Sequence, residues 1–350
     1  MTSERREKEA RVLRYLEEHN FEALVLSRVE NFAWLTAGGL NRIVTTEAAG
    51  AATLVYTRNG GKYVVTNVSE ARRIEEEEVP EDWEVRSCRW DEDQTKLITL
   101  KNAVADTPDW GLPPATGFAR LRYQLTPPEI ERLRWLGAQA GHAVAEACRR
   151  HVPGETEHVA AARLHEALTP EGITPAVVLV SSDERLFRYR HPVPTAKPVD
   201  RYMMVVVVAE KWGLHAAATR FVSFGALSDE LARKFDAVAK IDNVYIEGTR
   251  PGAPVAEILK QGIAAYAATG FPTEWQFHHQ GGAIGYAPRE YVATLNSQET
   301  VLENQAFAWN PSITGAKTED TILVTAHGHE NLTAVADWPL VAGRPLPLIR

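Results

Sequence analysis

The chain has 350 residues, 45% of them hydrophobic and 24% charged, and its formal net charge is -8. This composition is typical of a globular protein with room for two domains, and the dispersed acidic charge excludes a basic surface for nucleic acid. Cys88 and Cys148 are the only cysteines, which excludes a disulfide framework.

No segment resembles a membrane span or a secretion signal. The longest uncharged apolar run extends from Met203 to Ala209, far short of the roughly 20 residues that cross a bilayer. The first 20 residues form a charged amphipathic pattern without the apolar centre of a signal peptide. We therefore expect a cytoplasmic protein with no membrane partner.

The first third of the sequence predicts a small α/β domain. The turn residues Arg58-Asn59-Gly60-Gly61 favour a hairpin between two strands. The expected elements are, in order, a helix to about residue 20, a strand at 21–27, strands at 52–57 and 62–67, a helix from about 69 and a strand near 83–89. The Pro/Gly-rich stretch at 106–117 then predicts an interdomain linker, so we expect domains at 1–120 and 121–350.

The second domain is predicted to begin with a helix. Thr126-Pro127-Pro128-Glu129 combines a capping hydroxyl, prolines in the first turn and a capping-box glutamate. The expected elements are helices at 126–151 and 155–168, strands near 175–180, 202–210 and 217–222, helices from 228 and at 255–268, and a strand-rich tail. Helices followed by an antiparallel-looking sheet favour an α+β fold, with the helices on one face of a curved sheet.

The segment at 199–225, VDRYMMVVVVAEKWGLHAAATRFVSFG, resembles the sheet hairpin of the pita-bread family of aminopeptidase P, prolidase, methionine aminopeptidase and creatinase. In that family the hairpin reads approximately D-x-G-A-x-x-x-G-Y-x-S-D-x-T-R. Weaker matches follow in the same order, and the resemblance covers nearly the whole chain. It implies a pita-bread C-terminal domain, a smaller creatinase-type N-terminal domain and a homodimer.

The resemblance also implies that the family's dinuclear metal centre is lost. Val206 and Ala217 stand where the two metal-binding aspartates belong, Gly282 replaces the ligand histidine and Asn310 replaces a ligand glutamate, so that only Glu319 remains. Hard divalent cations need several anionic oxygens or imidazoles. We therefore expect no metal cofactor and no metal-activated water, unless other ligands have been recruited.

His191 is the first candidate for the chemistry. It lies where this family carries a histidine near the substrate, and the resemblance to creatinase, a metal-free hydrolase, implies a general acid/base there. A loop histidine bonded to backbone is the alternative. His278 and His279 are expected on a strand, with side chains facing opposite ways, so that at most one enters the pocket; we favour His279. If His191 and His279 both enter the pocket, they can in principle hold one softer metal ion together with Glu319.

The remaining candidates are charged or polar residues. Glu319, as a catalytic or substrate-holding group, is expected to pair with Lys317 and Arg289, because a buried carboxylate is costly alone; an internal ion pair without a catalytic role is the alternative. Arg289 stands at the family's second histidine and suits a substrate carboxylate, or a surface acid such as Glu290. Asn310 orients the substrate or caps its turn.

Several other residues receive mainly structural interpretations. Thr219 and Arg220 are expected to be structural, the arginine by anchoring nearby carbonyl groups, and His215 to be solvated at the rim of the hairpin. The family's dimer implies that Trp34, Asn41 and Arg42 contact the substrate of a partner subunit.

Three functions remain open. The first is a metal-independent hydrolase of a C–N bond in a small amino-acid-like or amidine-like substrate, with His191 as general acid/base and the other candidates as substrate ligands. The second is an inactive homologue that binds a peptide, a metabolite or a partner protein in the old pocket. The third is an Xaa-Pro peptidase with unconventional metal ligands.

Overall fold

The computed structural model describes residues 2–350. The chain divides into two compact units, the first ending at Arg122 and the second spanning Tyr123–Arg350. Among the described residues, no helix is both long enough and apolar enough to cross a membrane.

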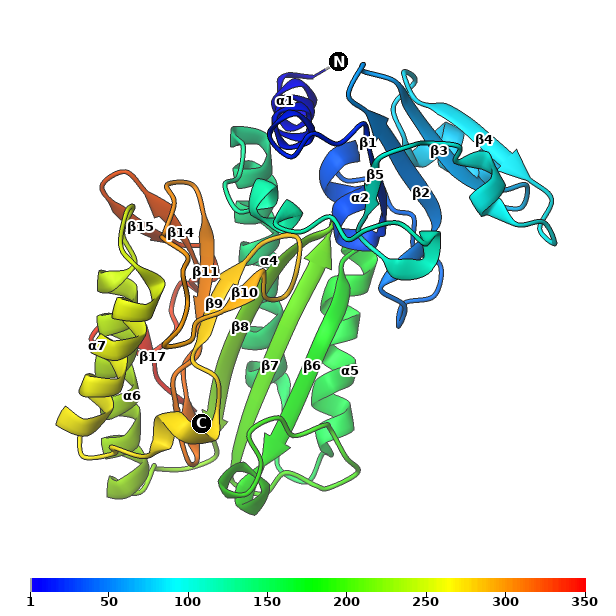
Figure 1. Cartoon of the computed structure of the whole chain (residues 1–350). Coiled ribbons are helices and arrows are strands. Elements are labelled where there is room, and N and C mark those ends of the chain that lie inside the picture. The colour runs from blue at the N-terminus through cyan, green and yellow to red at the C-terminus, as the bar shows by residue number, and fades with distance from the viewer. Residues whose placement is uncertain (1) are drawn as a thin grey trace. The chain divides into compact units, whose positions relative to one another are not determined.

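The first unit is a five-stranded mixed sheet with short helices (Figure 1). Its strand order is β4-β3-β2-β1-β5, in which the β1–β5 and β3–β4 pairs are parallel and the other pairs antiparallel. The predicted hairpin is confirmed, with Tyr56 opposite Lys62. The elements are α1 (Ser3–Glu18), β1 (Ala23–Arg28), α2 (Val29–Thr36), β2 (Ala49–Thr57), β3 (Lys62–Asn67), α3 (Ala71–Arg73) continuing as the π-turn Ile74–Glu78, β4 (Glu84–Cys88), the 3-10 turn Gln94–Leu97, β5 (Ala103–Ala105), and the 3-10 turns Pro108–Trp110 and Phe118–Arg122.

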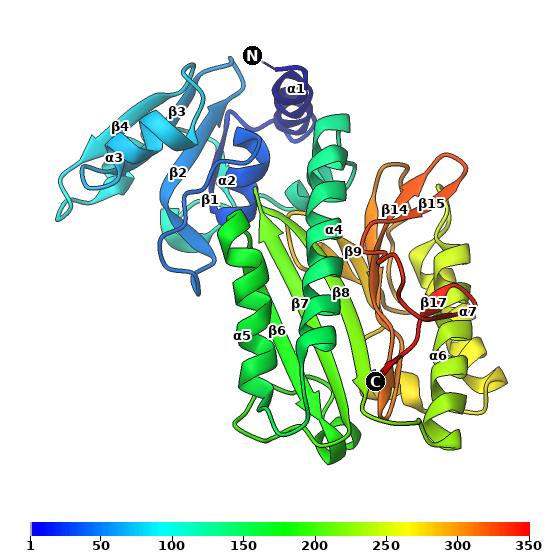
Figure 2. The same ribbon diagram turned by 180° about the vertical axis from the view of Figure 1, so that it is seen from behind.

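The second unit begins with two helices that cover one face of a sheet, as predicted. Figure 2 shows α4 and α5 in front of β6, β7 and β8, and the sheet order is β18-β8-β7-β6. The capping box of Thr126 and Glu129 is present at the start of α4. These elements are α4 (Pro127–Arg150), α5 (Glu157–Leu168), the 3-10 turn Thr169–Glu171, β6 (Thr174–Ser182), the 3-10 turn Asp183–Phe187, β7 (Tyr202–Lys211), β8 (Leu214–Ser223) and β18 (Leu348–Ile349).

A second sheet of five strands, in the order β10-β9-β11-β14-β15, is covered by α6 and α7. The ring of Tyr245 on α6 stacks on Trp309 of β11 at a centroid distance of 4.7 Å. The remaining elements are α6 (Asp229–Gly248), α7 (Val255–Ala268), the 3-10 turn Glu274–Phe277, β9 (Gly281–Ile284), β10 (Tyr291–Val292), β11 (Ala306–Trp309), β12 (Ser312–Ile313), β13 (Ala316–Lys317), β14 (Asp320–Thr325), β15 (Gly328–Asn331), β16 (Leu340–Val341) and β17 (Arg344–Pro345).

The two sheets of the second unit meet at Thr219 and Glu319. The backbone N–H of Thr219, on β8, donates to the carbonyl oxygen of Glu319 at 3.0 Å, and the two residues form an isolated antiparallel bridge. On β7, Val206 lies opposite Thr219 and Val208 opposite Ala217. The junction therefore brings Glu319 beside the hairpin that was singled out in the sequence.

Candidate functional site

A cavity of about 300 Å³ lies in the second unit, beside the junction of its two sheets. One wall is apolar and comes from β6 and β7, while the other carries most of the candidate residues. Its lining consists of Val177, Leu179, His191, Val206, Val208, His279, Pro288, Arg289, Asn310, Lys317 and Glu319. The sequence-based candidates therefore converge, except for His278, which lines an adjoining pocket.

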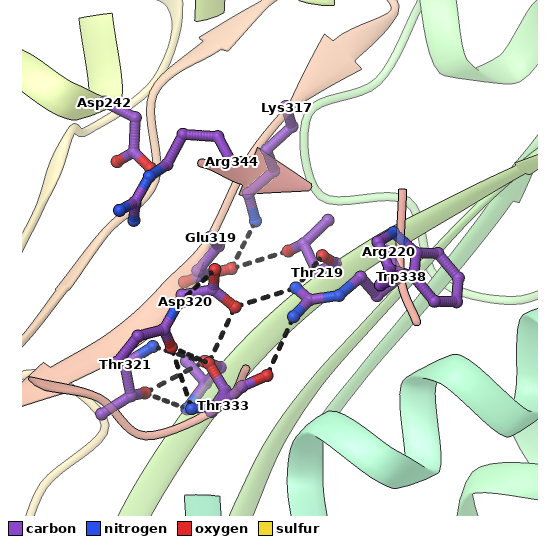
Figure 3. A network of polar contacts seen from close by, with 12 residues as sticks. Thr219, Arg220, Asp242, Lys317, Glu319, Asp320, Thr321, Thr333, Trp338 and Arg344 are labelled. Atoms are coloured by element: carbon purple, nitrogen blue, oxygen red, sulfur yellow. Dashed lines mark hydrogen bonds and ion pairs between the residues drawn. The ribbon is translucent and has the colours of Figure 1, made fainter. Parts of the chain in front are cut away.

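Glu319 is the centre of the charged cluster in this cavity. Lys317 Nζ donates to its Oε2 at 2.7 Å, and Arg289 Nη2 donates to its Oε1 at 2.8 Å. The hydroxyl of Thr219 also donates to Oε2, at 2.9 Å. Figure 3 shows Lys317 and Thr219 pointing at the carboxylate of Glu319. The predicted pairing with Lys317 and Arg289 is confirmed, and Arg289 does not use a surface acid instead.

The two cations decide the protonation state of Glu319. Burial alone raises the pKa of a carboxyl group, but Lys317 and Arg289 outweigh burial and hold the pKa of Glu319 well below its usual range. The carboxylate is therefore ionised throughout the physiological pH range. Two cations and one anion leave the cavity with one net positive charge if its histidines are neutral.

A second buried ion pair lies directly beside the first. Arg220 Nη1 is 2.9 Å from Asp320 Oδ1, and Arg220 also donates to the carbonyl oxygens of Thr219 and Thr333. Thr333 Oγ1 donates to Asp320 Oδ1 at 2.8 Å (Figure 3). Arg220 thus anchors neighbouring carbonyls, as predicted, and fixes the backbone from which Glu319 projects.

Three histidines form a cluster at the edge of the cavity. His191 Nε2 and His278 Nε2 are 2.9 Å apart, and the rings of His278 and His279 stack with centroids 4.5 Å apart and planes inclined by 24°. One ring nitrogen from each of the three residues lies within 4.8 Å of the others. We call these three residues the histidine trio.

The placement of His278 and His279 on a strand was wrong. Both residues follow the 3-10 turn Glu274–Phe277 and precede β9, which begins at Gly281. Outside a strand, neighbouring side chains need not alternate, and here the two rings lie on the same side. His279 lines the cavity, as favoured, while His278 bonds to His191. The hydrogen-bond partner of His191 is therefore a histidine side chain, whereas the alternative interpretation expected a backbone group.

The environment of the trio disfavours its protonated forms. Burial, and then the charge of Lys317, lowers the pKa of His278 to about 2. Burial, and then Arg289, lowers the pKa of His279 to about 4. His191 is the most exposed of the three residues, but partial burial of its ring, and then the charge of Lys317, lowers its pKa below the ordinary value. All three imidazoles are therefore neutral at pH 7.

Three polar atoms at the site have no hydrogen-bond partner among the described residues. They are Asn310 Oδ1, Arg289 Nε and His278 Nδ1, all of them buried. Buried polar groups in native proteins are nearly always bonded. An orphaned acceptor and an orphaned donor on residues that line one cavity are suited to a ligand that supplies the complementary groups.

The donor set does not fit the dinuclear metal centre that the fold resemblance implies. Val206, Ala217 and Gly282 provide no ligand side chain, Asn310 is neutral, and both oxygens of Glu319 already accept bonds from cations of the chain. A Cβ atom added to Gly282 would lie 2.2 Å from the carbonyl oxygen of Tyr291. The chain therefore has no room to restore the ligand histidine without a backbone shift.

Three further expectations were wrong. His215 is buried, not solvated, and its Nδ1 lies 3.2 Å from the carbonyl oxygen of Gly285. Trp34 and Asn41 are fully buried in the first unit, where Asn41 Nδ2 donates to the carbonyl oxygens of Ser27 and Ala52. Their side chains therefore cannot contact a partner's substrate. Arg42 is partly exposed.

The sequence did not single out the residues that support the trio. Arg190, which precedes His191, forms an ion pair with Glu274 and donates to Ser312 Oγ at 3.1 Å and to Thr314 Oγ1 at 3.0 Å. Gln280 donates to the carbonyl oxygen of His278 at 2.6 Å and accepts from Tyr266 at 2.8 Å. Apart from Gln280 and His278, which are two positions apart, the partners lie 14 to 124 positions apart in the sequence. No local sequence pattern reveals such pairs.

The second unit is a pita-bread domain: a sheet backed by two helices is joined, beside a polar cavity, to a second sheet that is covered by helices. The model of metallopeptidase family M24 matches residues 131–326, more than half of the chain. The chain therefore belongs to metallopeptidase family M24.

Individual relatives agree with this family. The chain is 28% identical over 218 residues to the probable dipeptidase PepE of Mycobacterium tuberculosis, and this match covers 60% of the chain and 58% of the relative. Less than two thirds of that relative's length is therefore matched. The structure of dipeptidase PepE from Mycobacterium ulcerans is similar at a TM-score of 0.81, with 20% identity, 99% of this chain and 98% of that chain covered. The prolidase of Thermococcus sibiricus gives a TM-score of 0.83 at 16% identity, with 100% of both chains covered.

Proposed function

We propose that the protein is a hydrolase that cleaves a C–N bond in a small amino-acid-like or amidine-like substrate without a dinuclear metal centre. The observation that carries the proposal is the convergence of His191, Arg289 and Lys317 on one cavity. An imidazole that moves protons and a net positive charge that attracts a substrate carboxylate are together sufficient for binding and acid–base chemistry.

His191 is proposed as the general acid/base. Its Nε2 shares a hydrogen bond with His278 Nε2, and either nitrogen can be the donor. When His191 donates, its Nδ1 keeps a lone pair and accepts a proton from water as the water oxygen attacks the substrate carbon. The same proton is then transferred to the leaving nitrogen as the C–N bond breaks. His278 is a positioning residue in this scheme, because it selects the tautomer of His191.

The substrate is proposed to carry a carboxylate and an N–H group beside an apolar part. Arg289 and Lys317 bind the carboxylate, and the orphaned Arg289 Nε is an available donor. Asn310 Oδ1 accepts the N–H group, and His279 lines the same wall. Glu319 acts through the two cations that it holds, which favours a positioning role over direct binding of substrate. The apolar part contacts the wall formed by Val177, Leu179, Val206 and Val208.

The test is a substrate screen with the full chain. Small amides, amidines and Xaa-Pro dipeptides are incubated with the protein in the presence of a chelator or of Mn²⁺. We expect chelator-insensitive turnover of a small carboxylate-bearing compound, and a decrease of about 100- to 10,000-fold in the His191→Ala variant, the usual contribution of a general acid/base. The His142→Ala variant, changed at an exposed position on α4, is the matched control and is expected to retain the wild-type rate.

Two outcomes of this screen contradict the proposal. Turnover that His191→Ala leaves unchanged removes the acid/base. Cleavage of Xaa-Pro dipeptides that requires Mn²⁺ replaces the proposal by an unconventional metallopeptidase.

A binding protein without activity is the second candidate. The observation that favours it is the saturation of Glu319, whose oxygens already accept bonds from Lys317, Arg289 and Thr219. If this candidate is correct, no compound in the screen is hydrolysed, although a carboxylate-bearing amide binds saturably and Arg289→Ala weakens that binding.

We also propose a homodimer, which the family resemblance supports, and a cytoplasmic location. Sedimentation equilibrium that gives the mass of a single chain at micromolar concentration contradicts the dimer. Fractionation of expressing cells that places the protein outside the cytoplasm contradicts the location.

A further inference from the structure

The histidine trio has a geometry that the proposed acid–base chemistry does not require. One imidazole suffices to move a proton, and a second suffices to orient the first. Here a third ring, His279, stacks on His278, and one nitrogen of each residue lies within 4.8 Å of the others.

We propose that His191, His278 and His279 form a mononuclear site for a nitrogen-preferring divalent transition metal ion such as Zn²⁺. In tetrahedral coordination with Zn–N distances of about 2.0–2.1 Å, ligand nitrogens lie roughly 3.3 Å apart. The 2.9 Å separation between His191 and His278 is already close to that value. The third ring nitrogen must move by about 1 to 2 Å to reach bonding distance. Rotation of the histidine side chains about their χ angles can produce such a displacement.

An ion pair behind the trio holds its two segments together. Arg190 lies next to His191 in the chain, and Glu274 lies four residues before His278. The two residues form an ion pair, and Glu274 also accepts from the backbone N–H of Thr314 at 2.9 Å. The loop that carries His191 is therefore tied to the segment that carries the other two histidines. Metal sites depend on such supporting contacts for the orientation of their ligands.

The ligand type selects among metals. Three imidazoles without a carboxylate favour Zn²⁺, Cu²⁺ or Ni²⁺, whereas Mg²⁺, Ca²⁺ and Mn²⁺ prefer oxygen ligands. The cations Lys317 and Arg289 oppose any divalent ion, but both are bonded to Glu319, which offsets part of their charge. This site is distinct from the dinuclear centre of the family, because none of its three residues stands at the five positions discussed above.

Metal binding has a consequence for activity that rests on the proposed function. A metal ion on His191 Nε2 leaves the ring proton on Nδ1, and this removes the Nδ1 lone pair that proton transfer requires. We therefore expect Zn²⁺ to inhibit turnover, with a midpoint equal to that of the binding titration.

The test uses the full chain, prepared without a polyhistidine tag, stripped with a chelator and dialysed. Calorimetric titration is expected to give one Zn²⁺ per chain and no comparable binding of Mn²⁺. His191→Ala, a change in an exposed loop, is expected to weaken Zn²⁺ binding by about 100-fold or more, whereas His142→Ala leaves it unchanged. Glu274→Gln, which touches none of the three ligands, is expected to weaken it about tenfold, as loss of a supporting contact does.

The outcomes separate this site from the proposed function. Absence of stoichiometric Zn²⁺ binding, equal affinity in His191→Ala, or equally tight Mn²⁺ binding overturns the metal site and leaves the acid–base proposal intact. Zn²⁺ that binds as expected without reducing turnover supports the metal site and overturns the role of His191 as acid/base.

Discussion

Glu319 is a buried carboxylate whose charge is balanced within the chain. Removing one partner of a buried ion pair is much more costly than replacing the whole pair by apolar groups, because an unpaired charge remains. The loss in free energy of unfolding when Glu319 is neutralised therefore measures how costly it is to leave Lys317 and Arg289 buried without their anion.

We expect Glu319→Gln to lower the free energy of unfolding by about 3 kcal/mol or more, the usual cost of breaking a buried pair. Urea unfolding measures this change. Glu257→Gln is the matched control, because Glu257 pairs with Lys260 on the surface, where both side chains are more than half exposed, and it is expected to cost less than about 0.5 kcal/mol. A Glu319→Gln/Lys317→Met double variant is expected to recover part of the loss, and simple additivity of the two changes argues against the pairing.

For individual residues, the sequence predicted the ion-pair partners of Glu319 better than it predicted where the histidine rings lie. Lys317, two residues from Glu319 on an extended segment, was a natural partner because alternate residues share a face. The burial of His215 and the stacking of His278 on His279 were not predictable in this way. Both depend on where Gly285 and the loop before β9 lie in three dimensions, and neither is encoded in local periodicity.

β9 carries Gly282, one of the positions where the ligand side chain of the family's metal centre is missing. It is the strand between β10 and β11, and Gly282 faces the backbone of β10 at close range. Gly328, at the start of β15, has nearly the same backbone angle, +155° against +157° for Gly282, but nothing lies within 4 Å of an added Cβ.

We expect Gly282→Ala to cost about 1–3 kcal/mol more than Gly328→Ala, because only the first adds a carbon 2.2 Å from a backbone oxygen. Since the two positions have nearly the same φ angle, the difference between the two losses of stability reports the missing space at Gly282. Urea unfolding of both variants measures it. Equal losses of stability would mean that β9 adapts, and that a histidine at 282 is sterically feasible.

Sequence patterns predicted the helices and strands of the first two thirds of the chain more successfully than the segment around His278, His279 and Gln280. The capping signal at Thr126 and Glu129 and the turn residues from Arg58 to Gly61 act locally, so they can be read without a structure. Gln280 interrupts an apolar and aromatic segment that reads equally well as a strand or a loop. In the structure Gln280 lies in a loop, where its side chain bonds to Tyr266 and to the carbonyl oxygen of His278. These bonds form only once the chain has folded.

For the molecule as a whole, the pH dependence of stability is expected to reflect Asp242. Both of its carboxyl oxygens lack hydrogen-bond partners among the described residues, and the nearest cation, Arg344 on β17, is 3.8 Å away. Burial raises the pKa of Asp242 to about 8, Arg344 opposes this shift, and the charges of Asp320 and Glu319 add to it. Asp242 and Arg344 are both visible in Figure 3.

Between about pH 4, where an unfolded aspartate titrates, and pH 8, the folded state keeps a proton that the unfolded state has lost. The contribution of protonated Asp242 to the free energy of unfolding is therefore fully present below pH 4 and is lost as the pH rises through this window, by up to about 1.4 kcal/mol per pH unit. We expect Asp242→Asn to flatten the decline between pH 5 and pH 8 in urea unfolding. Asp236→Asn, changed at a half-exposed position on the same helix, is expected to keep the wild-type slope, and an unchanged slope in Asp242→Asn contradicts this account.

The counter-charges of the Glu319 carboxylate belong to the same polypeptide. The Lys317–Glu319–Arg289 cluster is complete once the strands around it have closed. The charge of Glu319 is therefore balanced as soon as the chain has folded, and removal of divalent cations from the medium leaves these two ion pairs intact.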